Sequence, residues 1–157
     1  MKVIPVNYAL EFEPIFKNFT FNAKETITIS CKEHVNSITL HCAELKIKSC
    51  HIRQNGMTQK AITKTDAKKE ELTIAIKNKI KGTAFVEIEF TGILNDRLLG
   101  FYRSQYKQNG KTKYLATSQF EAADARRAFP CWDEPEAKAT FDISIIAENK
   151  FTAISNM

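Results

Sequence analysis

One stretch of the sequence concentrates the side chains that could do chemistry. It runs from Thr117 to Pro135, reads TSQFEAADARRAFPCWDEP, and mixes carboxylates, arginines, aromatic rings and two prolines. Pro130 and Pro135 restrict φ on either side of Trp132 and should stiffen the backbone there. We therefore expect a rigid corner in which Phe129 and Trp132 are core residues.

The ionisable groups of this stretch can satisfy one another. The guanidinium fork of arginine suits bidentate pairing with carboxylates in a partly buried loop. The candidates for such pairing are Asp124, Asp133 and Glu134 with Arg126 and Arg127. A scaffolding role is favoured over a chemical one for Arg126, Arg127, Asp133 and Glu134.

Gln119 and Glu121 precede the corner and differ from the rest. They lie two residues apart, so an extended backbone would point both side chains to the same face. A carboxylate beside a primary amide could hold a cationic amine and a neighbouring peptide group. The alternative is two exposed polar residues on a strand, and chemistry alone favours that alternative.

Other catalytic and metal-binding patterns are missing. None of His34, His41 and His51 begins an H-E-x-x-H motif, and the cysteines form no C-x-x-C pair. There is no G-x-S-x-G elbow and no glycine-rich phosphate loop. We expect no catalytic residue and no metal site in this chain.

The elements that would position these residues read as β-strands. Apolar residues alternate with polar ones in short segments bounded by turn residues, which is typical of half-buried strands. The alternating segments lie near residues 8–12, 27–31, 38–42, 72–76, 86–90 and 141–145. This spacing predicts an all-β antiparallel sandwich.

Turns and weaker segments complete the pattern. Asn55-Gly56 and Asn109-Gly110 are predicted hairpin turns, because both residue types tolerate positive φ. The polar segment 58–71 is predicted as a connecting loop or a weak strand edge. The alanines of 122–128 favour a helix that Pro130 soon ends, so at most a short turn is expected.

Composition fits one soluble domain. The chain has 157 residues, of which 43% are hydrophobic and 26% charged. The formal charge of +5 comes from scattered lysines without interleaved exposed aromatics, so nucleic-acid binding is not expected.

The sequence shows no signal peptide and no membrane-spanning run. The four cysteines are irregularly spaced, which favours reduced thiols and a cytoplasmic location. Cys31 and Cys42 are read as small buried hydrophobes.

The segment TSQFEAADARRAFPCWDEPEAKATFDI closely resembles the signature of the M1 aminopeptidases, as does Gly100–Ser104, GFYRS, after Gly92–Asp96. Weaker similarity runs from VNYALEFEP to the closing ISNM. The resemblance implies a saddle of β-sheet over residues 1–157, slightly short of the full domain, that caps a zinc-binding catalytic domain absent from this chain. The puromycin-sensitive and archaeal tricorn-associated branches are the most similar.

The resemblance also implies functional roles. Glu121 matches the glutamate that binds the free α-amine of the substrate, and Gln119 matches a residue lining the first side-chain pocket. Peptides with a free amino terminus would be the substrates, and the absent catalytic domain would be an intramolecular partner. Zinc would be the cofactor of the full-length enzyme and would not be bound by this chain, which alone is expected to be inactive. The alternative is a non-catalytic scaffold or binding protein that keeps the fold without the zinc site.

Overall fold

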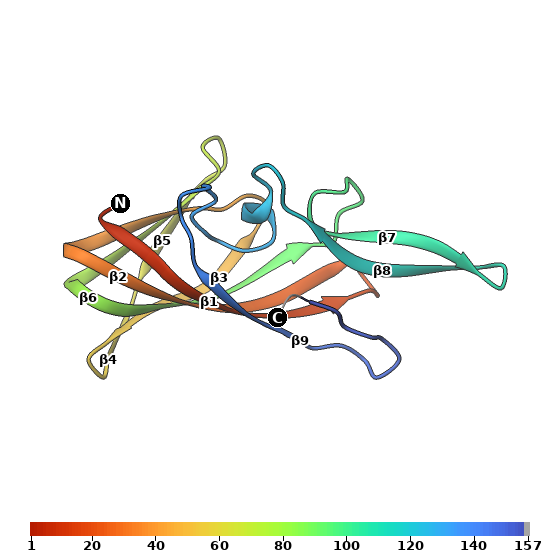
Figure 1. Ribbon diagram of the computed structural model, residues 1–157, viewed down its shortest axis with the longest axis horizontal. Coiled ribbons are helices and arrows are strands. Elements are labelled where there is room, and N and C mark those ends of the chain that lie inside the picture. The colour runs from red at the N-terminus through yellow and green to blue at the C-terminus, as the bar shows by residue number, and fades with distance from the viewer. Residues whose placement is uncertain (156–157) are drawn as a thin grey trace.

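The computed structural model describes residues 1–155 and is built almost entirely of β-strands (Figure 1). The strands are β1 (Val3–Ile15), β2 (Thr20–His41), β3 (Lys46–Gln54), β4 (Met57–Lys60), β5 (Ile62–Asp66), β6 (Glu71–Ile93), β7 (Gly100–Gln108), β8 (Lys111–Gln119) and β9 (Thr140–Ile145). A single 3₁₀ turn within the described residues, η1, spans Ala125–Arg127. The predicted all-β fold is confirmed, as is the prediction of no more than a short turn within 122–128.

The strands form one large sheet and one hairpin. The seven-stranded sheet has the order β4-β3-β6-β2-β1-β9, with β5 pairing to β6. Among the described strands β7 and β8 pair only with each other, and an isolated bridge joins Tyr102 of β7 to Asn95. All strand pairs are antiparallel except β1 with β9, which run parallel from Asn7↔Thr140 to Phe12↔Ile145. Residues 120–139 connect β8 to β9 and are called the crossover below. The candidate site lies in this crossover.

Strand β2 is longer than its sequence pattern suggested. The segments 27–31 and 38–42 looked separate, yet they belong to one strand that pairs with β6 along its length. Its pairing register shifts between Cys31 and Ser37, and the buried positions change from odd numbers, such as Ile29, to even numbers, such as Ile38. Because neighbouring strand residues face opposite sides, the irregularity returns the apolar side chains to the same core.

Two predicted turns are confirmed, and of the two alternatives predicted for residues 58–71 the weak strand edge is the one observed. Asn55 and Gly56 have φ of 49° and 76°, and Asn109 and Gly110 have φ of 53° and 73°, each pair closing a hairpin. The segment 58–71 is mostly strand, because β4 and β5 occupy it. Both are short edge strands with largely polar, exposed side chains, so they show little apolar alternation.

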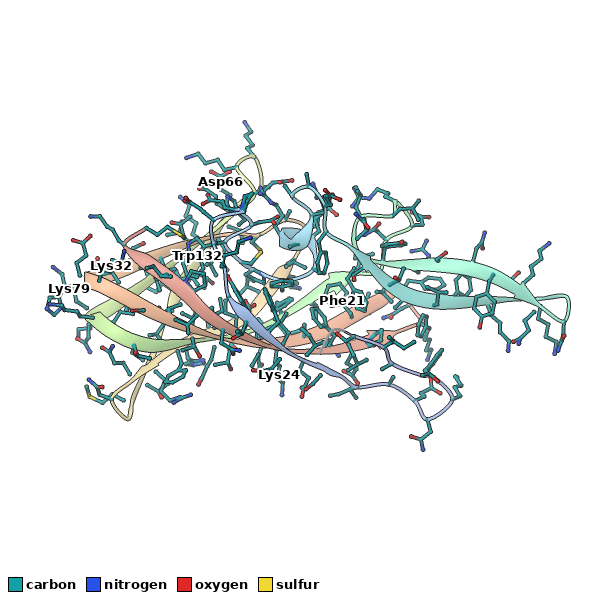
Figure 2. All side chains as sticks on the ribbon, viewed as in Figure 1. Phe21, Lys24, Lys32, Asp66, Lys79 and Trp132 are labelled. Carbon is teal, nitrogen blue, oxygen red and sulfur yellow. The ribbon has the colours of Figure 1, made fainter. Side chains whose placement is uncertain are left out.

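The core lies on one side of the sheet and continues under the crossover. Phe21, Ile27, Leu72 and Val86 are fully buried, and Phe21 is labelled in Figure 2. Ala128, Phe129 and Cys131 of the crossover join the same cluster. Phe129 is 4% exposed, as predicted for a core residue.

Trp132 does not fulfil the same expectation. Its side chain is only partly buried and packs against the edge of the core (Figure 2). The reason is its place just after Cys131, where the crossover turns back toward solvent before β9.

The four cysteines are buried and form no disulfide bonds with one another. The interpretation of Cys31 and Cys42 as small buried hydrophobes is confirmed. No helix among residues 1–155 is long and apolar enough to cross a membrane.

Candidate functional site

The crossover begins as a tight backbone structure at the end of β8. The Asp124 amide donates to the Phe120 carbonyl at 2.9 Å, and the Ala128 and Phe129 amides both donate to the Ala125 carbonyl, at 2.9 and 3.1 Å. Only the short turn that ends at Asp124 therefore separates residues 119–121 from the 3₁₀ turn η1. It fixes where those residues leave the hairpin.

The sheet holds the crossover through backbone hydrogen bonds. His41 and Cys131 form an isolated antiparallel bridge, with N···O distances of 2.7 and 3.0 Å. The Ala43 amide donates to the Arg126 carbonyl at 2.9 Å, and the Trp132 amide donates to the Tyr8 hydroxyl at 3.2 Å. The corner is thus tied to β2, to the segment after it and to β1.

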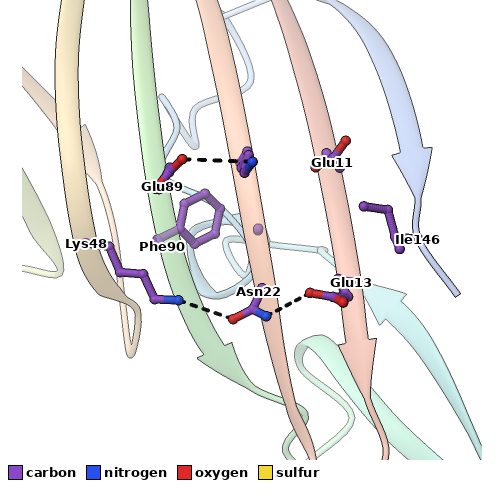
Figure 3. Close-up of a pocket in the computed structure, with 9 residues that line it drawn as sticks. Glu11, Glu13, Asn22, Lys48, Glu89, Phe90 and Ile146 are labelled. Carbon is purple, nitrogen blue, oxygen red and sulfur yellow. Dashed lines mark hydrogen bonds and ion pairs between the residues drawn. The ribbon is translucent and has the colours of Figure 1, made fainter.

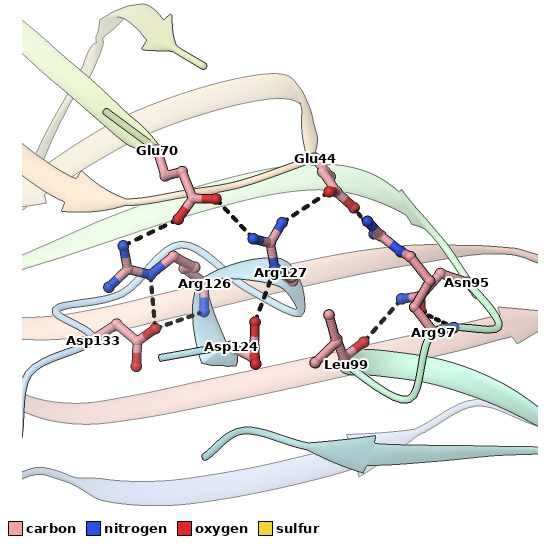
Figure 4. A network of polar contacts seen from close by, with 9 residues as sticks. All are labelled: Glu44, Glu70, Asn95, Arg97, Leu99, Asp124, Arg126, Arg127 and Asp133. Carbon is pink, nitrogen blue, oxygen red and sulfur yellow. Dashed lines mark hydrogen bonds and ion pairs between the residues drawn. The ribbon is translucent and has the colours of Figure 1, made fainter. Parts of the chain in front are cut away.

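Arg126 and Arg127 organise a network of carboxylates around η1 (Figure 4). Arg126 Nε donates to Asp133 at 2.9 Å and its Nη1 to Glu70 at 3.3 Å. Arg127 reaches three carboxylates, at 2.8 to 2.9 Å, which belong to Glu44, Glu70 and Asp124. Arg97 also contacts Glu44, which extends the network to the loop before β7.

The electrostatics of the network favour charged arginines. Burial lowers the pKa of Arg126, but the hydrogen bond and charge of Asp133, with a contribution from Glu70, outweigh burial, so the pKa is raised overall. The same balance raises the pKa of Arg127, through Asp124, Glu70 and Glu44. The predicted scaffolding role therefore fits Arg126, Arg127 and Asp133.

Sequence reasoning missed part of this network and assigned one member wrongly. Glu134 was a candidate partner, but it is exposed and joins no ion pair among the described residues. Glu44 and Glu70 occupy that role, although they lie far away in the sequence. Both have positive φ, 60° and 54°, which marks them as turn residues but does not identify their partners.

The hairpin base is packed closely against η1. Gly100 pairs with Gln119 and has a φ of +65°, a conformation that glycine adopts without steric cost. A Cβ at this position would lie 2.7 Å from Cβ of Arg127. The end of β8 is therefore set against the arginine network, and Gly100 in the GFYRS motif makes the close approach possible.

Gln119 and Glu121 lie at this junction and are exposed. Gln119 is the last residue of β8, whereas Glu121 lies outside the strand, in the turn that leads to η1. The extended backbone assumed for a shared strand face is thus absent at Glu121. No ion pair within residues 1–155 involves Glu121, so its carboxylate is available to a cation from outside the chain.

An apolar pocket of about 230 Å³ adjoins the turn. Ala122, Phe129, Trp132 and Phe141 contribute to its lining. Phe120 and Phe141 remain 37% and 48% exposed. A carboxylate, an amide and a partly uncovered apolar surface therefore occur together at this end of the crossover.

A second hollow, of about 270 Å³, lies elsewhere on the sheet, away from Glu121 (Figure 3). Its side chains pair with one another: Lys48 donates to Asn22 at 3.3 Å, and Asn22 donates to Glu13 at 2.8 Å. Polar groups that satisfy each other on an open sheet surface are solvated structure and indicate no chemistry.

Metal ligation receives no support from the described residues. Among residues 1–155, no group of three or more His, Cys, Asp or Glu side chains is placed to hold a metal ion. His41 Nδ1 accepts a hydrogen bond from the Asp133 amide at 3.1 Å. His34 is exposed and His51 is partly buried on β3.

Comparison with known proteins agrees with the β architecture and with the motif at the crossover. The protein-family model of the peptidase M1 N-terminal domain matches residues 4–157 of this chain. The chain belongs to the M1 peptidase family. It matches the amino-terminal domain of that family.

Relatives from several organisms carry aminopeptidase names. Aminopeptidase 2 of Candida albicans is 43% identical over 156 residues, covering 98% of this chain and 17% of the relative. The puromycin-sensitive aminopeptidase of Caenorhabditis elegans is 41% identical, covering 98% and 17%. The alanine/arginine aminopeptidase of Saccharomyces cerevisiae is 40% identical, covering 99% and 19%. The chain thus spans less than one fifth of the length of these relatives.

Proposed function

We propose that this chain is the substrate-pocket domain of a zinc metallo-aminopeptidase that removes amino-terminal residues from peptides. In this proposal residues 1–157 cap a catalytic zinc domain that lies outside the chain. The relatives, of whose length this chain covers 17% to 19%, carry aminopeptidase names and support the assignment. A cytoplasmic location is part of the proposal, in line with the reduced cysteines.

Glu121 carries the proposal. Its carboxylate is exposed and unpaired with any described cation, and the turn that carries it leads into the arginine network. Two arginines lie close in sequence, yet Asp124, Asp133, Glu44 and Glu70 already neutralise them. Glu121 can therefore give its full charge to the free α-amine of a peptide.

Gln119 supplies the complementary polar contact. Its amide can both donate and accept hydrogen bonds, and its place at the end of β8 puts it at the start of the same turn. It would line the pocket for the first side chain of the substrate. The apolar surface around Ala122, Trp132 and Phe141 would be covered by the remainder of the protein or by the substrate.

Zinc does not fit the residues of this chain. The described residues offer no ligand set, so the metal would be held by segments outside the chain. Zinc would supply Lewis-acid activation of the scissile carbonyl there. The contribution of this chain is to bind and orient the amino terminus, because leaving an ammonium group buried without a partner is costly.

The test is Glu121→Gln in the full-length protein that contains this chain. The substitution keeps the volume and removes the charge, so kcat/KM on an aminoacyl arylamide should fall by about 30- to 1,000-fold, or ~2 to 4 kcal/mol. Zinc content should not change. Glu136→Gln, an exposed carboxylate outside the turn, is the matched control and should keep wild-type efficiency. Wild-type efficiency in the Glu121 variant would remove the amine-binding assignment.

The alternative function is a non-catalytic scaffold or binding protein of the same fold. In that case the full-length protein would bind no stoichiometric zinc and would not hydrolyse arylamides, whatever residue occupies position 121. The unpaired Glu121 favours the enzyme, since a scaffold has no need of an available carboxylate at this turn.

A further inference from the structure

The hairpin β7–β8 is the most isolated element of the structure. It extends away from the large sheet (Figure 1), and its register runs without interruption from Gly100↔Gln119 to Gln108↔Lys111. Within the described residues β8 pairs with β7 alone, so its outer edge carries unpaired backbone groups. An edge of this kind can accept an extended peptide.

The charges of the hairpin all have one sign. Between residues 100 and 119 the charged side chains are Arg103, Lys107, Lys111 and Lys113, with no Asp or Glu, in a chain whose formal charge is +5. Arg103 is held at the base, 3.0 Å from Asp96 and 4.4 Å from the centre of the Phe19 ring. The three lysines nearer the tip are exposed, and none pairs with a carboxylate among residues 1–155.

Two of these lysines share a strand face with the candidate site. Alternate residues of β8 point to the same side, which places Gln119, Leu115, Lys113 and Lys111 on one face. Tyr106 lies opposite Lys113 in the register, and Leu115 and Tyr106 are 41% and 43% exposed. The face therefore runs from the amide of Gln119 over an apolar middle to a cationic tip.

We propose that this face of β8, from Gln119 to Lys111, binds the downstream part of peptide substrates and favours those with acidic side chains about six to eight residues from the amino terminus. This inference rests on the proposed function. With the amine at Glu121 and the first side chain at Gln119, a peptide running antiparallel to β8 would follow its free edge. Gln119 and Lys113 are separated by about 20 Å along the strand, the reach of roughly six extended residues.

The expected effect is moderate because the lysines are exposed. Charge pairs in water are weak and are screened by salt. Several lysines acting on a substrate with two or three carboxylates should change kcat/KM by about three- to tenfold, mainly through KM, because the contact is equally strong in the ground state and the transition state. The preference should shrink at high ionic strength.

The test uses the full-length protein and two nine-residue peptides that differ only at positions six to eight, with Glu in one and Lys in the other. An aminoacyl arylamide is too short to reach the hairpin and reports on the amine site alone. Wild type should prefer the Glu peptide, and Lys111→Glu combined with Lys113→Glu should reverse the preference while arylamide turnover stays constant. Lys107→Glu makes the same charge change as Lys113→Glu alone but on the other face of the hairpin, and it should have a smaller effect than Lys113→Glu.

The outcomes separate the two proposals. If wild type turns over the arylamide but treats both peptides alike, or if the double variant keeps the wild-type preference, the role of the hairpin is refuted and the amine site stands. If wild type with bound zinc does not turn over the arylamide, the proposed function fails and this inference fails with it.

Discussion

Arg127 donates a hydrogen bond from Nη2 to Oε1 of Glu70 at 2.8 Å, across 57 positions of sequence. Glu70 also accepts from Arg126 at 3.3 Å, so one carboxylate joins both arginines of η1 to the turn before β6 (Figure 4). The side chains of Arg126 and Arg127 are only 14% and 18% exposed, so water could replace a lost ion pair only in part. This contact is one of several that hold η1 against the sheet, together with the Ala43–Arg126 backbone hydrogen bond.

Replacing Glu70 with Gln should therefore destabilise the fold. The amide keeps the shape but cannot accept charge-assisted hydrogen bonds from both guanidinium groups, so the free energy of unfolding should fall by about 1 to 3 kcal/mol. Urea unfolding of the purified chain would measure it. Glu136→Gln should stay within about 0.5 kcal/mol of wild type, and a Glu70 variant equally close to wild type would show that the network is dispensable.

The fold was more accessible from the sequence than the site was. Apolar alternation and the two Asn-Gly turns act locally, so the strands and hairpins could be predicted. The partners Asp124 and Asp133 lie within seven residues of the arginines and could also be predicted. Glu44 and Glu70 could not, because their role depends on strand pairing that brings distant turns beside η1.

Glu121 shows a second limit. Its spacing from Gln119 is correct for a strand, but β8 ends at Gln119 and the turn that follows sets the direction of the carboxylate. That turn is held by tertiary contacts of the crossover, so periodicity could not reveal it. Its functional role stays a prediction that the Glu121→Gln experiment tests.

Phe129 and Trp132 should differ in their contribution to stability. Phe129 is 4% exposed and contacts the Tyr8 ring edge-on at 5.8 Å between centroids, so Phe129→Ala should cost about 3 to 5 kcal/mol. Trp132 is only partly buried, and its replacement by Ala should cost about 1 to 3 kcal/mol. Parallel urea titrations of both variants would check the order, and an equal or larger loss for Trp132 would contradict it.

The chain by itself should bind no stoichiometric zinc. The described residues offer no cluster of ligands, and His41 Nδ1 is engaged by the Asp133 amide. After incubation with zinc and dialysis, metal analysis should find far less than one equivalent, with a His34→Ala, His41→Ala, His51→Ala triple variant as the baseline. One tightly held zinc per chain that the triple variant loses would refute the expectation.

Glu25 is the residue from which we expect a pH dependence of stability. It is 2% exposed on β2, and neither carboxyl oxygen has a hydrogen-bond partner among the described residues. Burial raises the pKa of Glu25 well above 4.5. The titratable groups around it are Tyr8, Cys42, Cys50 and Cys131, and burial also raises the pKa of each, to about 12 for Cys42 and Cys50. They stay neutral in the range where Glu25 matters.

The sign follows from proton binding in the two states. Below about pH 4.5 the carboxyl is protonated in both the folded and the unfolded chain and has no effect on the pH slope. Above that pH the unfolded chain releases the proton while the folded chain keeps it, so stability falls by up to about 1.4 kcal/mol per pH unit until the folded pKa is reached.

Two variants test this dependence. Glu25→Gln cannot ionise and should remove the pH slope. Glu25→Leu should also raise stability near pH 8, because it replaces an unpartnered polar group with an apolar one. Urea unfolding of the three proteins from pH 4.5 to 8 provides the measurement, and subtracting each variant from wild type cancels the other titrating groups. A difference between wild type and Glu25→Gln that does not change with pH would mean that Glu25 reaches water or a partner in solution.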